Sequence, residues 1–139
     1  MRSDDSPATN DSAADRRGIR VVLCDDHAVV RAGLTRLLDA IDGIHVVATA
    51  VDGRDGVEAA ARLRPDVVLM DLSMPHLNGV AATRQIAAAA PGTRVVVLTS
   101  FHHQAQIADA IAAGARAYVL KDATPAELVA AIRAACEDA

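Results

Sequence analysis

The chain has 139 residues, of which 52% are hydrophobic and 1% aromatic, and its formal net charge is −4. This length suits one domain, and the scarcity of aromatic residues predicts a core of Val, Leu, Ile and Ala. No cluster of Lys and Arg occurs, so we expect no direct contact of this chain with nucleic acid. Cys24 and Cys136 are far apart and form no zinc-type pattern, which favours reduced thiols. Cys24 lies inside an apolar run, which predicts a reduced core residue and a reducing, cytoplasmic setting. There is neither an apolar run of about 18 residues nor a signal-peptide core, so we expect no membrane segment.

The first 17 residues are rich in Ser, Asp, Asn, Thr and Pro, so we expect a disordered tail over 1–17 and a folded domain over 18–139. In that domain, short apolar runs alternate with segments of helical periodicity. The expected strands are 19–24, 44–48, 67–71, 94–98 and 117–120, and the expected helices are 30–41, 52–64, 78–90, 104–113 and 125–136. This alternation predicts an α/β fold with a doubly wound five-stranded parallel sheet, flavodoxin-like, in the strand order 2-1-3-4-5.

Two of the predicted helices differ in how firmly they pack. The order Thr124-Pro125-Ala126-Glu127 is that of a capping box with Pro at the first helical position. The helix that follows has an apolar stripe that we expect in the core, with dimer contacts at its edge; the stripe is Leu128, Val129, Ile132 and Cys136. The helix 104–113 is weaker, because Ile107 and Ile111 are its only large apolar residues.

Polar side chains follow four of the five predicted strands. They are Asp25 and Asp26 after the first strand, Asp71 at the end of the third, Thr99 and Ser100 after the fourth, and Lys121 after the fifth. In the predicted strand order the first and third strands are neighbours, so the three carboxylates would crowd together and would need a cation such as Mg²⁺. A carboxylate beside a metal ion, a lysine and a hydroxyl suits phosphoryl transfer onto an aspartate.

These residues resemble the receiver domain of bacterial two-component response regulators, over about Gly18 to Cys136. Asp25-Asp26 is similar to the acidic pair of that family. The stretch Asp71 to Gly79 is similar to its D-x-x-M-P-x-x-x-G loop, with Asp71 as the phospho-acceptor. The Asp-Asp-His start, the Gly114 to Tyr118 approach and the Leu-Lys-Asp-Ala-Thr end resemble the NarL/FixJ subfamily, which has a LuxR-type output domain.

The resemblance implies that a sensor histidine kinase phosphorylates Asp71. It also implies a Mg²⁺ ion held by Asp26, Asp71 and the Ser73 backbone carbonyl, with Asp25 acting through water. Further implied roles are phosphoryl stabilisation by Thr99 and Lys121, a switch at Tyr118, and flanking positions for Ser100, Phe101 and His27. Such a domain is a signalling phospho-acceptor and not an enzyme, although it assists its own Mg²⁺-dependent phosphorylation and dephosphorylation.

NarL/FixJ proteins continue into a helix-turn-helix output domain that is absent from these 139 residues. We therefore favour a fragment of a transcription regulator, which would reach DNA only through that domain and could form a homodimer. The alternative is a stand-alone single-domain receiver or docking module. A haloacid-dehalogenase-type phosphatase is disfavoured because it needs D-x-D where this chain has Asp25-Asp26-His27, and an FMN binder because two carboxylates would repel its phosphate.

Overall fold

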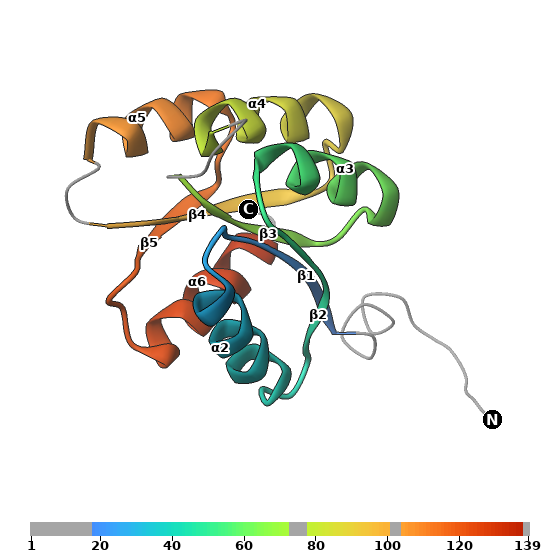
Figure 1. Cartoon of the computed structure of the whole chain (residues 1–139), viewed down its shortest axis with the longest axis vertical. Coiled ribbons are helices and arrows are strands. Elements are labelled where there is room, and N and C mark those ends of the chain that lie inside the picture. Colours follow the sequence, from blue (N-terminus) through green and yellow to red (C-terminus); the bar gives the residue numbers. More distant parts are fainter. Residues whose placement is uncertain (1–17, 73–77, 101–103, 138–139) are drawn as a thin grey trace.

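A computed structural model of the chain describes residues 18–72, 78–100 and 104–137 (Figure 1). The predicted tail over 1–17 lies outside these residues. Strands and helices alternate along the described chain, as the sequence predicts. They are β1 (Ile19–Cys24), α2 (Ala28–Asp39), β2 (Ile44–Ala50), α3 (Gly53–Leu63), β3 (Val67–Asp71), α4 (Gly79–Ala89), β4 (Arg94–Thr99), α5 (Gln104–Ala113), β5 (Ala117–Leu120) and α6 (Pro125–Cys136).

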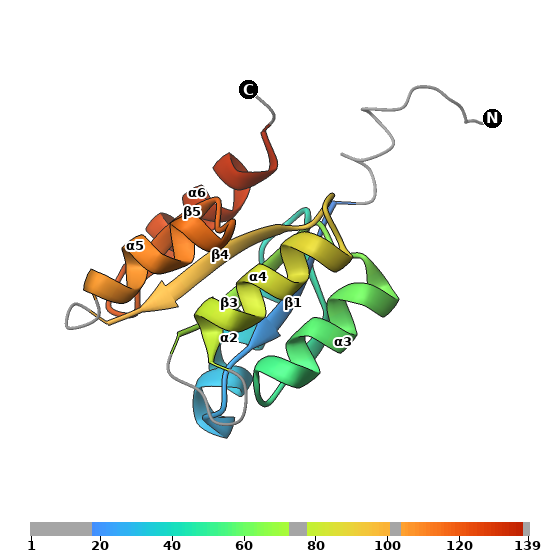
Figure 2. The ribbon, with the colours of Figure 1, turned by 90° about the horizontal axis from the view of Figure 1, so that it is seen from above.

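The five strands form one parallel sheet in the order β2-β1-β3-β4-β5, which confirms the predicted doubly wound fold. Helices α3, α4 and α5 cover one face of the sheet, and α2 and α6 cover the other (Figures 1 and 2). The chain passes outward from β1 to β2 through α2 and then returns past β1 to β3 through α3. The carboxyl ends of β1 and β3 are therefore neighbours at the point where the winding reverses.

The core consists of two apolar layers, one on each face of the sheet. Because successive strand residues point to opposite faces, the run at the start of β3 serves both layers. Val68 and Met70 pack under α3, α4 and α5, whereas Val67 and Leu69 pack under α2 and α6. All four side chains are fully buried, which explains why this strand shows no polar alternation.

Side-chain caps define where three helices begin. The capping box predicted for α6 is present: the Thr124 hydroxyl accepts from Glu127 N at 3.1 Å, and the Glu127 carboxylate accepts from Thr124 N at 2.8 Å. Asn78 caps α4 by accepting from Ala81 N at 2.9 Å. Asp52 caps α3 by accepting from Asp55 N, also at 2.9 Å, so this predicted helix residue lies just before the helix.

The packing of α5 and α2 shows details that the sequence pattern does not reveal. Ile111 is 45% exposed, so α5 is held to the sheet by Ile107 and the fully buried Ala110 instead of by two isoleucines. On α2, Leu38 is fully buried, but Leu34 and the other apolar residues on that side of the helix are only partly buried. Within the described residues, no helix combines the length and the apolar character needed to cross a membrane.

Cys24 occupies a tight position between β1 and α3. Its Sγ is fully buried and donates to Asp52 O at 3.1 Å. A Cβ at Gly56 would lie 2.8 Å from this Sγ, so only glycine lets α3 come so near the strand. Burial, and then the nearby Asp52 carboxylate, raise the pKa of the Cys24 thiol from 9.0 to about 12. Cys24 is therefore a protonated core residue, as the sequence predicts.

We predict that Cys24 makes the stability of the protein sensitive to alkali. Above a pH of about 9 the unfolded chain loses the Cys24 proton while the native protein keeps it, so the free energy of unfolding falls as the pH rises from about 9 to about 12. The slope is about 1.4 kcal/mol per pH unit within that window. Urea unfolding at a series of pH values measures it. Cys24→Ala should be less stable at neutral pH but should lose less stability in alkali, and equal slopes for the two proteins would contradict the prediction.

Candidate functional site

Three carboxylates and one imidazole meet at the carboxyl ends of β1 and β3. One ligand atom from each of Asp25, Asp26, His27 and Asp71 lies within 4.8 Å of all the others. Asp25 and Asp71 are buried, while the side chain of Asp26 is 29% exposed. The convergence predicted from the strand order is therefore present, and His27 belongs to the cluster itself.

Asp25 holds the loop after β1 in place, because both its backbone N–H and its side chain form hydrogen bonds. Its backbone N–H donates to Ala50 O of β2 at 3.0 Å, and its Oδ1 accepts from His27 N at 2.8 Å. The Nδ1 atom of His27 lies 3.1 Å from Asp26 Oδ1 and 3.3 Å from Asp25 Oδ1. The imidazole thus lies between the two members of the acidic pair.

Sequence reasoning missed the part played by Arg31. Its Nη1 donates to the backbone oxygen of Asp25 at 2.9 Å, which ties the acidic loop to the first turns of α2. Arg31 lies four residues after His27, one turn along the helix, so the two side chains share a face. That spacing was the available signal, although it does not reveal which atom the guanidinium contacts.

At the end of β3 a glycine lets α4 come close to the strand. A Cβ at Gly79 would lie 2.5 Å from Asp71 O and 2.7 Å from the Cα of Leu72, so no other residue fits this approach. The N–H of Gly79 donates to Leu72 O at 3.2 Å, and its carbonyl accepts from the Thr83 hydroxyl at 2.7 Å. The glycine of the predicted D-x-x-M-P-x-x-x-G motif thus lies directly against Asp71 and Leu72. Ser73, predicted to supply a metal ligand, lies outside the described residues.

Lys121 links the acidic cluster to strands β4 and β5. Its Nζ lies 3.2 Å from Asp71 Oδ2, and its backbone N–H donates to Thr99 O of β4 at 2.7 Å. The Lys121 side chain is 33% exposed, while Asp71 is buried. The ends of β3, β4 and β5 are therefore linked through one lysine.

Thr99 and Tyr118 lie on one face of the sheet but in different environments. Strand register places Tyr118 beside Val97, so by alternation Thr99 and Tyr118 face the side covered by α5. The Thr99 side chain is fully buried and its hydroxyl donates to Ser100 O at 3.3 Å. Tyr118 is 52% exposed. Phe101, predicted to flank the site, lies outside the described residues.

The charges of the cluster suit a cation. Asp25 Oδ2 is buried and accepts no hydrogen bond from the described residues. Burying a carboxylate oxygen without a donor is costly, so this atom indicates a missing partner. Carboxylate oxygens close together are the donors that hard divalent ions take. The residues present therefore form a site that could hold a metal ion.

The strand order and the acidic edge are those of a receiver-type α/β domain, and comparison with known proteins gives its family. The family model described as response regulator receiver domain matches residues 21–133. The chain therefore belongs to the response regulator receiver domain family. This membership agrees with the resemblance seen in the sequence and leaves the phosphatase and FMN-binding alternatives without support.

Similar proteins place the chain near the NarL and LuxR-type regulators. It is 46% identical over 117 residues to the transcriptional regulatory protein LiaR of Bacillus subtilis (strain 168), covering 84% of this chain and 56% of LiaR. It is 40% identical over 116 residues to the oxygen regulatory protein NreC of Staphylococcus aureus (strain JH9), covering 83% of this chain and 54% of NreC.

Among solved structures, the signal receiver domain of the putative response regulator NarL from Mycobacterium tuberculosis matches with a TM-score of 0.82 and 32% identity. That match covers 86% of this chain and 97% of the other. The chain spans about half the length of the curated relatives that it matches.

Proposed function

We propose that this receiver domain accepts a phosphoryl group on Asp71 from a sensor histidine kinase. The observation that carries the proposal is the position of Asp71, a buried carboxylate between the acidic pair and Lys121. A nucleophilic Asp71 oxygen would attack the phosphorus atom as the bond from phosphorus to the kinase histidine breaks, which leaves an acyl phosphate on Asp71. The other groups then have to neutralise charge on the transferring phosphoryl oxygens.

Each neighbouring residue has a distinct part in this proposal. Lys121 already pairs with Asp71 and would pair with a phosphoryl oxygen, and the Thr99 hydroxyl would donate to another. Mg²⁺ would be held by Asp26, Asp71 and the Ser73 carbonyl, with Asp25 acting through water, and the clustered carboxylates support such a site. When bound, it would neutralise charge on the carboxylates and on the phosphoryl oxygens. His27 and Ser100 would flank the site, while Arg31 holds the acidic loop in place.

The relatives support a proposal about the output of this domain. LiaR is named a transcriptional regulatory protein and is longer than this chain, which supports an output to transcription through a DNA-binding domain outside these residues. The buried thiol of Cys24 supports a reducing, cytoplasmic setting. If the domain forms a homodimer, we propose that the exposed edges of α5 and α6 make the contact.

We further propose that Thr99 and Tyr118 convert phosphorylation into a change of surface. A phosphoryl group on Asp71 would draw the Thr99 hydroxyl toward it and leave space on the face covered by α5. The exposed Tyr118 ring could then turn inward to fill that space. Helix α5 suits such a change because Ala110 and Ile107 provide only a small apolar anchor.

We predict that Asp71 is modified by a small phosphodonor. On incubation with acetyl phosphate and Mg²⁺, the intact mass should rise by one phosphoryl group. Asp71→Asn should remain unmodified, because it lacks the nucleophilic carboxylate, whereas Asp109→Asn, which changes an exposed carboxylate on α5, should react like the wild type. A phosphorylated Asp71→Asn protein, or equal labelling in the presence of EDTA, would refute the assignment.

We predict that Mg²⁺ stabilises the fold through the acidic pair. A ligand that binds only the native state adds about 2.7 kcal/mol at about 100 times its dissociation constant. The melting temperature should therefore rise during a Mg²⁺ titration of the wild type and rise much less for Asp26→Asn. Asp42→Asn alters an exposed carboxylate outside the cluster and should respond like the wild type. An equal shift in all three proteins would place the metal elsewhere.

We predict that the effect of phosphorylation reaches β5 and α5 through Thr99. Beryllofluoride, which mimics a phosphoryl group, should shift the NMR resonances of Tyr118 and of α5 in the wild type. Thr99→Ala should reduce these distant shifts, because the methyl group cannot donate to the mimic, and Thr99→Ser should restore them. If the shifts stay confined to the loops around Asp26 and Asp71 in the wild type, the proposed switch is wrong even where phosphorylation is confirmed.

A further inference from the structure

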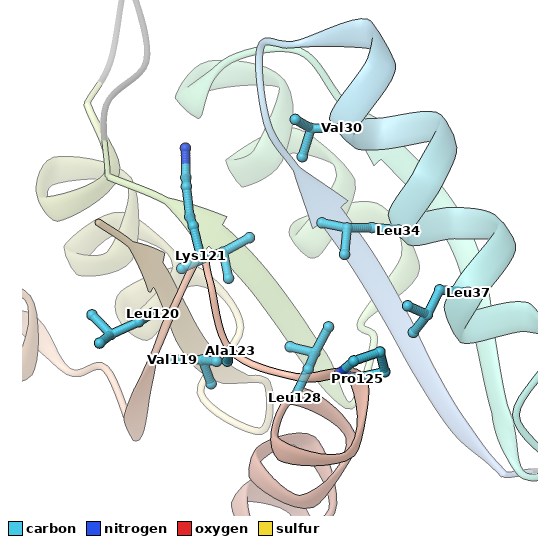
Figure 3. A pocket seen from close by; sticks show the side chains of 10 residues that line it. Val30, Leu34, Leu37, Val119, Leu120, Lys121, Ala123, Pro125 and Leu128 are labelled. Carbon is cyan, nitrogen blue, oxygen red and sulfur yellow. The ribbon is translucent and has the colours of Figure 1, made fainter. Parts of the chain in front are cut away.

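A cavity of about 160 Å³ separates α2 from α6 on the face of the sheet opposite α3, α4 and α5 (Figure 3). Val30 and Leu34 of α2 form one wall, and Pro125 and Leu128 of α6 form the other. The described walls are apolar except at Lys121, which lies at the rim.

The cavity follows from unequal helix packing on the two faces. On the far face the backbone of α4 runs close to both α3 and α5, whereas α2 and α6 scarcely approach each other. Although α2 and α6 share one apolar core, they pack only loosely at the end that carries Val30 and Leu34, and these two side chains stay partly buried. Leu98 of β4 and Val119 of β5 form the floor of the cavity between the two helices.

Lys121 connects this cavity with the acidic cluster. In Figure 3 its side chain rises from the rim, and its nitrogen points away from Leu128 and the other apolar side chains at the bottom of the cavity. The same nitrogen lies 3.2 Å from Asp71 Oδ2. One ammonium group thus borders both an apolar cavity and a buried carboxylate.

We propose that the cavity binds a small amphiphilic carboxylate, with its apolar body between α2 and α6 and its carboxylate at Lys121. An apolar cavity of about 150 Å³ holds a benzene molecule, so the body would be one aromatic ring or a short branched chain. Apolar walls with a single cationic group at the mouth are the features that orient such a ligand. The proposal does not rest on Asp71 accepting a phosphoryl group.

The shared lysine makes the ligand and Asp71 compete. Lys121 has three donors, but a second carboxylate beside it would be repelled by the negative charge of Asp71. Removing that charge should therefore tighten binding of an anionic ligand and leave a neutral ligand of the same shape unaffected. Because binding free energies are reciprocal, the ligand would in turn weaken the hold of Lys121 on Asp71.

Benzoate and its neutral analogue benzyl alcohol test the site by NMR titration of the full chain. Benzoate should bind saturably with a dissociation constant in the millimolar range, as expected for so small a ligand. Shifts should map to Val30, Leu34, Val119 and Leu128, and benzyl alcohol should bind about three- to fivefold more weakly, which is the usual worth of one partly exposed ion pair. Equal affinities, shifts that map elsewhere, or the absence of saturable binding by benzoate would overturn the proposal.

Variants at the rim distinguish binding of benzoate in the cavity from binding to the surface around it. Val30→Phe should fill the mouth and weaken benzoate binding several-fold, whereas Val29→Phe, on the neighbouring position that is 85% exposed, should leave it unchanged. Ala123→Leu fills the cavity from the opposite side and provides the same test should Val30→Phe fail to fold. Unchanged benzoate affinity in a folded filling variant would overturn the proposal.

Asp71→Asn tests the competition for Lys121. This variant should bind benzoate about three- to fivefold more tightly than the wild type, while its affinity for benzyl alcohol should not change. No gain for benzoate would overturn the assigned position of the carboxylate. Since the readout is binding alone, this result is separate from the outcome of the phosphorylation experiment.

Discussion

The crowding of three carboxylates at the junction of β1 and β3 is the constraint on which the rest of the structure depends. Like charges at this distance destabilise one another, and Asp25 and Asp71 are also removed from solvent. Lys121, which follows the edge strand β5, offsets part of this negative charge. The protein thus keeps a locally unfavourable arrangement that a bound cation could relieve, while two apolar layers stabilise the whole.

Most of the fold could be predicted because its signals are local. The uninterrupted apolar run before Asp71 indicates a strand covered on both faces, and the Thr124-to-Glu127 capping box marks a helix start. The acidic cluster also followed from the sequence, since strand order alone brings the ends of β1 and β3 together. What made this inference possible is that parallel strands with helical crossovers place all their carboxyl ends at one edge.

The details that could not be predicted depend on distances between elements that are far apart in the sequence. Ile111 and Ile107 have the same local pattern, yet only the way α5 lies on the sheet decides that Ile111 is exposed. The half-buried stripe on α2 likewise reflects how far α6 stands from it. Arg31 could be placed on a helix face, but its contact with a backbone oxygen requires the actual shape of the loop.

The exposed position of Tyr118 has a practical consequence. This phenol is the only tyrosine in a chain that has no tryptophan. It lies on β5, on the face that the proposed switch would alter, and more than half of it is in contact with solvent. Its ultraviolet absorbance and fluorescence therefore come from one known place, so the unlabelled protein contains its own optical reporter for the packing of that face.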